Sequence, residues 1–200
     1  MRKNMILCCL LLLASVPAFG AGAGDAAAPA VDHAGQLADL RKAAERGDAL
    51  AQWRLGVAFD TGDGVKADPA EAVKWFQRAV ASGSAQAHAS MALMFATGRG
   101  VPVDFQAARD LYRKAAAMGE THGFYGVAVL YARGEGVPQD MTEAMAWMLV
   151  AGSQGDEQAT KLINSGAFDS VDAQKAIPRA EAILKEFGLP AVEFRYQDVR

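Results

Sequence analysis

The feature that most constrains this chain is a spacing of 36 residues that recurs along it. Gly47, Gly83, Gly119 and Gly155 mark the period, and each stands 36 positions after the glycine before it. A fixed period between about 20 and 50 residues is typical of a solenoid, in which each repeat packs only against its neighbours. The chain is therefore predicted to fold as a stack of similar short units.

Other residues keep the same spacing through three units without an insertion. They are a Gly-x-Gly-Val turn, an aspartate and an alanine, found as Gly62-Asp63-Gly64-Val65, Gly98-Arg99-Gly100-Val101 and Gly134-Glu135-Gly136-Val137, as Asp68, Asp104 and Asp140, and as Ala72, Ala108 and Ala144. This register predicts full repeats over about 47–82, 83–118 and 119–154. Partial repeats are expected on either side, within an array that spans 32–188.

Each unit is predicted to contain two helices. In the first, Ala51, Leu55 and Phe59 recur every four residues and so share one helical face. That helix is expected to end at the Gly-x-Gly turn, where a glycine adopts the left-handed conformation that closes a helix. The second helix is predicted to begin after Asp68, an N-cap residue that Pro69 follows at the first helical position.

The second helices carry the expected core. Ala72, Trp75-Phe76 and Ala79 are spaced as one helical face, and we interpret the equivalent Tyr112 and Trp147-Met148 as core residues too. Glu71 and Glu143 follow their N-cap aspartates by three residues, which predicts capping boxes. The fold class predicted from these patterns is an all-α solenoid of helix-turn-helix repeats.

Residues 1–20 have the three-part pattern of a secretory signal peptide. Arg2 and Lys3 precede an apolar run over 5–13, and small residues lead to a predicted cut after Gly20. The run is shorter than the ~20 residues that a membrane-spanning helix needs, so no span is expected after cleavage. Localisation is therefore predicted to be periplasmic, or secreted. Both cysteines lie inside the run, so the processed chain is expected to depend on core packing rather than disulfides.

The two ends of the processed chain differ from the repeats. Residues 21–31 are rich in Ala and Gly and are interpreted as a flexible leader. A capping helix is predicted over about 170–187, with Ser170 as its N-cap, and Pro178 either kinks this helix or begins it. In the tail, 189–200, Val192, Phe194 and Tyr196 alternate with polar residues. That tail either folds back on the last helix, adds as a strand to a partner's sheet edge, or extends freely.

Composition and motifs argue against several functions. The formal net charge is −3, and a phosphate-backbone binder would carry a basic stripe, so no nucleic acid is expected. The sequence contains neither a Gly-x-Ser-x-Gly nor a Ser-x-x-Lys motif, so no nucleophilic serine is indicated. The three histidines are unclustered, and neither a metal site nor a cofactor is predicted.

The repeated unit, A-x-A-x-x-x-L-G-x-x-(Y/F), then G-x-G-V-x-x-D, then A-x-x-W-(F/Y)-x-x-A-x-x-x-G, resembles the Sel1-like repeat, a relative of the tetratricopeptide repeat. The Leu55-Gly56 pair becomes Met91-Ala92 and Val127-Ala128 in the later copies, which conserves size. The resemblance implies a non-enzymatic scaffold or adaptor that holds another protein on a curved surface. For exported bacterial members it implies an envelope partner, or a host protein if the chain is secreted.

The alternative is a cell-wall-acting hydrolase, or a penicillin-binding or β-lactamase-like protein. A cysteine-rich branch of the family has been described in those terms, but that branch pairs cysteines within its repeats. The processed chain has no cysteine and no nucleophile motif. The non-enzymatic interpretation is therefore preferred.

Candidate contact residues are those that the core pattern leaves unexplained. The first helices line the concave face in related superhelices, and Trp, Tyr and Arg commonly anchor protein partners. Trp53, Arg54 and Tyr125 are therefore the predicted binding residues. Ordinary packing between neighbouring repeats is the competing explanation for the two aromatic residues.

Overall fold

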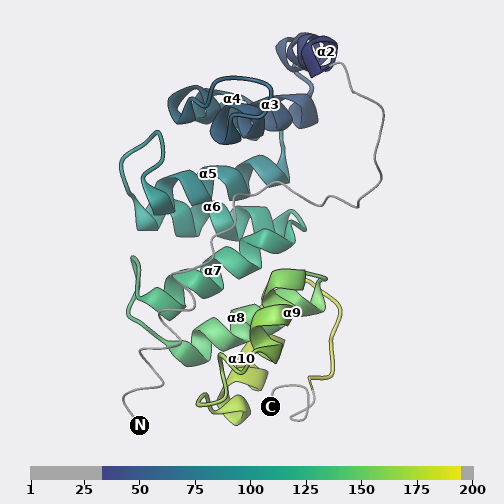
Figure 1. The fold of residues 1–200 in the computed structure, drawn as a ribbon. Helices are drawn as coiled ribbons and strands as arrows, with labels where there is room; N and C mark the ends of the chain where they lie inside the picture. The colour runs from purple at the N-terminus through teal and green to yellow at the C-terminus, as the bar shows by residue number, and fades with distance from the viewer. Residues whose placement is uncertain (1–32, 195–200) are drawn as a thin grey trace. The chain divides into compact units, whose positions relative to one another are not determined.

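The computed structural model describes residues 33–194, and every regular element within that range is an α-helix (Figure 1). The helices are α2 (His33–Glu45), α3 (Ala49–Thr61), α4 (Pro69–Ala81), α5 (Ala85–Thr97), α6 (Phe105–Ala117), α7 (Thr121–Arg133), α8 (Met141–Ser153), α9 (Glu157–Asn164) and α10 (Ala173–Glu186). The predicted signal peptide and the leader over 21–31 lie outside the described residues.

The predicted all-α repeat solenoid is confirmed. In chain order, the helix pairs of the three repeats are α3–α4, α5–α6 and α7–α8. The partial repeats on either side are α2 and α9. The described residues form two compact units, 33–103 and 104–194. In the first, α3 packs against both α2 and α4; in the second, α7 packs against α6 and α8. None of the helices between residues 33 and 194 has the length and apolar character that a membrane-spanning helix needs.

Turn chemistry explains why the helices begin and end where they do. Gly62, Gly98 and Gly134 close the first helices with φ values of 80°, 70° and 70°, in the left-handed region. Asp68 then caps α4, and its carboxylate accepts a 3.0 Å hydrogen bond from the Glu71 backbone N–H. Asp104 and Asp140 cap α6 and α8 in the same way. The predicted N-caps of the second helices are thus confirmed.

The reciprocal half of the predicted capping boxes is wrong. The Asp68 backbone N–H donates to the carbonyl of Phe59 at 2.8 Å, across the turn, and the Glu71 carboxylate pairs with Lys74 instead. In the third repeat, Asp140 likewise donates to a carbonyl of the preceding helix, and Glu143 pairs with Arg179. The tight Gly-x-Gly turn brings that carbonyl to the N-cap, so the glutamate is free for other partners.

In the unit over 33–103, a compact apolar core joins α2, α3 and α4. Ala44, Ala51, Leu55 and Trp75 are buried together, and Phe59 packs against them. This is the face that the four-residue spacing in the first helix predicted, and Trp75 lies in the core as expected. The alanines allow close approach of the helices, because a methyl group occupies little space between two backbones.

In the unit over 104–194, α8 is covered on all sides. Its residues 144–151 are all buried, and the helix packs against α7, α9 and α10 (Figure 1). A helix that is apolar all round needs cover all round. The predicted capping helix supplies that cover. It begins later than expected, because Asp172 rather than Ser170 is the N-cap, and it runs through Pro178 without starting there.

An aromatic cluster fixes the capping helix to the repeats. Trp147 of α8 and Phe124 of α7 meet Phe187, which follows α10, with ring centroids 5.7 Å and 5.2 Å from the Phe187 ring. The Arg113 guanidinium lies 5.4 Å from the Trp147 ring and pairs with Glu186. Trp147 and Phe124 are fully buried, which confirms that the tryptophan of the repeat motif is a core residue here.

Beyond α10, the alternation noted in the tail is visible as alternating exposure. Val192 and Phe194 are partly buried, whereas Ala191 and Glu193 are exposed. Tyr196 lies outside the described residues.

Candidate functional site

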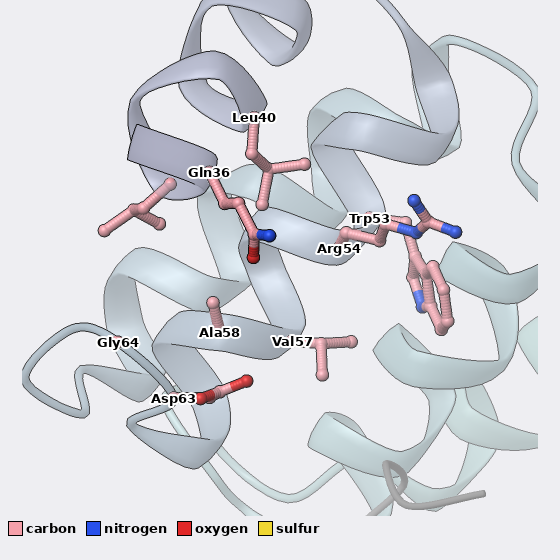
Figure 2. Close-up of a pocket in the computed structure, with 9 residues that line it drawn as sticks. Gln36, Leu40, Trp53, Arg54, Val57, Ala58, Asp63 and Gly64 are labelled. Atoms are coloured by element: carbon pink, nitrogen blue, oxygen red, sulfur yellow. The ribbon is translucent and has the colours of Figure 1, made fainter. Parts of the chain in front are cut away.

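A pocket between α2 and α3 contains two of the three predicted contact residues (Figure 2). We call it the α2–α3 pocket. Its volume is about 300 Å³, and it is lined by Gln36, Leu37, Leu40, Trp53, Arg54, Val57, Ala58, Asp63 and Gly64. Figure 2 shows Gln36 and Leu40 of α2 on one side and Val57 and Ala58 of α3 on the other. The floor is therefore largely apolar, while Arg54 and Asp63 supply a charge of each sign.

Trp53 contributes to the α2–α3 pocket but is also engaged in packing. The side chain is half-buried, and its indole Nε1–H donates a 2.9 Å hydrogen bond to the hydroxyl of Ser90 on α5. This bond joins the first helix of one repeat to the first helix of the next. Packing between repeats therefore accounts for the orientation of the indole.

Arg54 has a different environment. It is exposed, lines the α2–α3 pocket, and forms no ion pair with any carboxylate in the range 33–194. An unpaired guanidinium beside an apolar floor is suited to binding a carboxylate from outside the chain, because its planar fork matches that group. Its role in binding remains a prediction.

Tyr125 lies in the unit over 104–194, on α7, whereas Trp53 and Arg54 lie in the other unit. It is half-buried. Burial raises the pKa of the Tyr125 phenol, and the carboxylate of Asp156, the N-cap of α9, raises that pKa further. Tyr125 is thus close enough to the start of α9 to interact with its N-cap, whereas Trp53 contacts Ser90 in the middle of α5. The prediction that it contacts a partner is neither supported nor contradicted by this position.

One inter-repeat contact was not predicted from the sequence. Arg99, in the turn after α5, forms a 2.7 Å ion pair with Asp60 on α3 and also donates to the Asp60 backbone carbonyl at 3.0 Å. Burial raises the pKa of the Asp60 carboxyl, and the Arg99 charge opposes that rise. The sequence feature that could have indicated this ion pair is the middle residue of the Gly-x-Gly turn. It is charged in every repeat but differs between them, as Asp63, Arg99 and Glu135.

His88 and His122 both contact the N-cap residues of their own helices. His122 Nδ1 lies 2.7 Å from the carboxylate of Glu120, the N-cap of α7, and His88 Nδ1 lies 2.9 Å from the carbonyl of Ser84, the N-cap of α5. Within residues 33–194, no group of three or more His, Cys, Asp or Glu side chains could hold a metal ion. The α2–α3 pocket, which two of the predicted contact residues line, is the candidate binding site.

The Trp53–Ser90 contact gives a direct prediction on stability. Trp53→Phe keeps an aromatic ring but removes the donor, and is expected to lower the free energy of unfolding by about 1 kcal/mol, the usual value of one hydrogen bond. Ser90→Ala is expected to cost a similar amount. In a double-mutant cycle measured by urea denaturation, the two losses should not add, since both remove the same bond. Fully additive losses would contradict the contact.

The fold and the α2–α3 pocket define an α/α repeat protein with a surface suited to binding, and comparisons with known proteins identify the family. The Sel1 repeat family model matches residues 49–84, 85–120 and 124–156, more than half of the chain. The chain therefore belongs to the Sel1 repeat family, as the resemblance of its repeats indicated. No curated protein matches the chain.

Two solved structures are similar to this chain. A Sel1 repeat protein from Oxalobacter formigenes is 27% identical with a TM-score of 0.65, over 78% of this chain and 65% of that one. The second is c5321, which displays an SLR fold and is a protective antigen present in uropathogenic Escherichia coli strains. It is 30% identical with a TM-score of 0.63, over 78% of this chain and 32% of its own. This chain thus covers less than two thirds of either neighbour.

Proposed function

We propose that this protein is a non-enzymatic scaffold of the bacterial cell envelope that binds another protein on the face presented by its first helices. Sel1 repeats are commonly protein-interaction scaffolds, and three consecutive copies make up most of this chain. The observation that carries the proposal is the exposed Arg54, which lines a largely apolar pocket at the first helix of the first repeat and has no ion pair within residues 33–194. Such a combination offers both buried area and one charge-assisted hydrogen bond to a protein partner.

An envelope location is part of the proposal and rests on the first 20 residues. Their basic start, short apolar run and small residues before Ala21 favour export and cleavage. That one structural neighbour is a protective antigen agrees with an exported protein. N-terminal sequencing of protein recovered from the periplasm should begin at Ala21, and deletion of residues 1–20 should leave the chain in the cytosol. Recovery of an intact N-terminus in the envelope would contradict cleavage.

Binding is tested by capture of tagged protein from its own envelope fraction after mild crosslinking. A specific partner should be recovered with the wild type and lost with the triple variant Trp53→Ala/Arg54→Glu/Tyr125→Ala. The single variant Arg54→Glu changes only an exposed side chain and should weaken capture without affecting folding.

A matched control changes exposed residues on the second helices. Gln77→Ala with Lys114→Glu alters α4 and α6 and should leave capture unchanged. A partner lost equally from this control would contradict binding by the first helices. Turnover of nitrocefin by the purified protein, above that of a heat-denatured sample, would contradict the non-enzymatic proposal.

A further inference from the structure

The α2–α3 pocket occupies a position that a helix fills in the next repeat. One period of 36 residues after Leu37, Leu40 and Arg54 stand Val73, Phe76 and Ser90. The side chains of these three later residues are only 6%, 2% and 7% exposed. Arg54 is exposed, and Leu37 and Leu40 are only partly buried. The same positions are therefore fully covered in one repeat and only partly covered, or exposed, in the repeat before it.

The contacts of α3 show what covers them. A Cβ on Gly56 of α3 would lie 2.6 Å from the Phe76 ring, so the two helices are in close contact there. Two further contacts of α3 are made with α5 and the turn after it: Trp53 donates to Ser90 of α5, and Asp60 pairs with Arg99 in that turn. Thus α3 lies in a site built by α4, α5 and the turn after α5. One period earlier, α2, α3 and the turn after α3 build the equivalent site, and no described helix occupies it.

The polar residues of the two sites differ in charge. Where the filled site has the Ser90 hydroxyl and the Arg99 guanidinium, the α2–α3 pocket has Arg54 and Asp63. A complementary helix in the pocket would therefore carry a carboxylate where α3 carries Trp53. It would carry a cation where α3 carries Asp60, seven residues later on the same side of the helix. A small residue belongs at the position of Gly56, because it would face Leu40.

The residues of this chain one period before α3 do not meet that requirement. Pro17, Gly20 and Gly24 stand where α3 has Trp53, Gly56 and Asp60, so the small residue is present but both charges are absent. Residues up to Gly20 are also predicted to be removed on export. The charge pattern therefore favours an occupant from another protein.

We propose that the α2–α3 pocket binds an amphipathic helix of a partner protein, one that carries a carboxylate for Arg54 and, seven residues later, a lysine or arginine for Asp63. This helix would continue the stack of first helices at its start. The inference rests on the proposed scaffold function and specifies where and by what chemistry one partner is bound. It assigns a role to Arg54 that the core pattern leaves unexplained.

The probe is a peptide of α3 itself, residues 49–61, carrying Trp53→Glu and Asp60→Lys. Because a short isolated helix is marginal in water, a hydrocarbon cross-link between the positions of Leu50 and Arg54 holds it helical. Both positions are exposed in α3. A second peptide, with Trp53→Lys and Asp60→Glu, carries the same two charges at exchanged positions. Fluorescence anisotropy with the full-length chain compares the two affinities.

The first peptide is expected to bind on the order of tenfold more tightly than the second, since two partly exposed ion pairs are replaced by two like-charge contacts. The protein variant Arg54→Glu/Asp63→Lys should reverse this preference. Both side chains are exposed, and position 63 already varies between repeats, so the variant should fold. Reversal supports the proposal in a way that loss of binding alone could not.

Several outcomes would overturn it. Equal affinity for the two peptides would reject the charge assignment, and no binding of either peptide would reject a helix site. A wild-type chain that dimerises in sedimentation experiments, with a monomeric Arg54→Glu/Asp63→Lys variant, would make a second copy the occupant. The Arg54→Glu/Asp63→Lys variant could also still capture a partner that the Tyr125→Ala variant loses. That result would support the scaffold function but show that the α2–α3 pocket is not its binding site.

Discussion

Trp147→Ala is expected to lower the free energy of unfolding by about 3–5 kcal/mol, the range for removing a large aromatic side chain from a core. Trp147 is 0% exposed and lies within an aromatic cluster with Phe124 and Phe187. Its indole N–H also donates a 3.2 Å hydrogen bond to Glu143, which in turn binds Arg179 of α10. Truncation therefore leaves a cavity and weakens the attachment of the capping helix.

Urea denaturation measures this loss, and Trp147→Phe is the matched control. The control keeps an aromatic ring in the cluster and is expected to cost far less, mainly the indole hydrogen bond and part of the packing. Hydrogen exchange should locate the effect of Trp147→Ala in α7, α8 and α10, the helices that meet at the cluster. Equal losses for the two variants would contradict a cluster that depends on ring volume.

The sequence predicts the helix pairs well because their ends are set by local chemistry. Asp68, Asp104 and Asp140 cap helices through bonds that span two or three residues, and the glycines that close the first helices act on their own backbone. Such interactions depend on neighbours in the chain, so the repeat register is enough to place them. The incorrect capping boxes have a different origin, since the competing carbonyl comes from the preceding helix.

The cover over α8 could have been anticipated from the same register. Ala146, Leu149 and Val150 stand where the earlier second helices have polar residues, namely Lys74, Gln77 and Arg78 in the first repeat and Asp110, Arg113 and Lys114 in the second. An apolar outer face on the last second helix indicates that another element covers it. The start of that element at Asp172 depends on the turns after α9, which have no counterpart in the repeats.

The site was harder to predict because it depends on stacking rather than on local pattern. The bond from Trp53 to Ser90 joins residues 37 apart, and the exposure of Arg54 results from a missing neighbour in the described chain. Neither is visible in the residue types alone. The residue types did identify Trp53 and Arg54 as outside the core pattern, and both line the α2–α3 pocket.

Gly100→Ala is expected to lower the free energy of unfolding by about 3 kcal/mol, far more than Gly64→Ala. The two glycines are equivalent in the Gly-x-Gly turn and have nearly the same backbone, with φ values of 69° and 68°. An alanine in this left-handed conformation costs about 1–2 kcal/mol at either position. At Gly100, however, the added Cβ would lie 2.4 Å from the carbonyl oxygen of Pro69, whereas at Gly64 nothing lies within 4 Å.

This pair of variants isolates the contact between repeats. Replacing glycine by alanine also reduces the entropy of the unfolded chain, but that effect is the same at both sites and cancels in the difference. The remaining difference is the cost of moving the start of α4 away from the turn, about 1–3 kcal/mol for an overpacked contact. Gly136→Ala should behave like Gly100→Ala, because its Cβ would meet Phe105 at 2.6 Å. Equal urea midpoints for Gly64→Ala and Gly100→Ala would show that the second glycine is required only for its φ, and that repeat stacking does not depend on it.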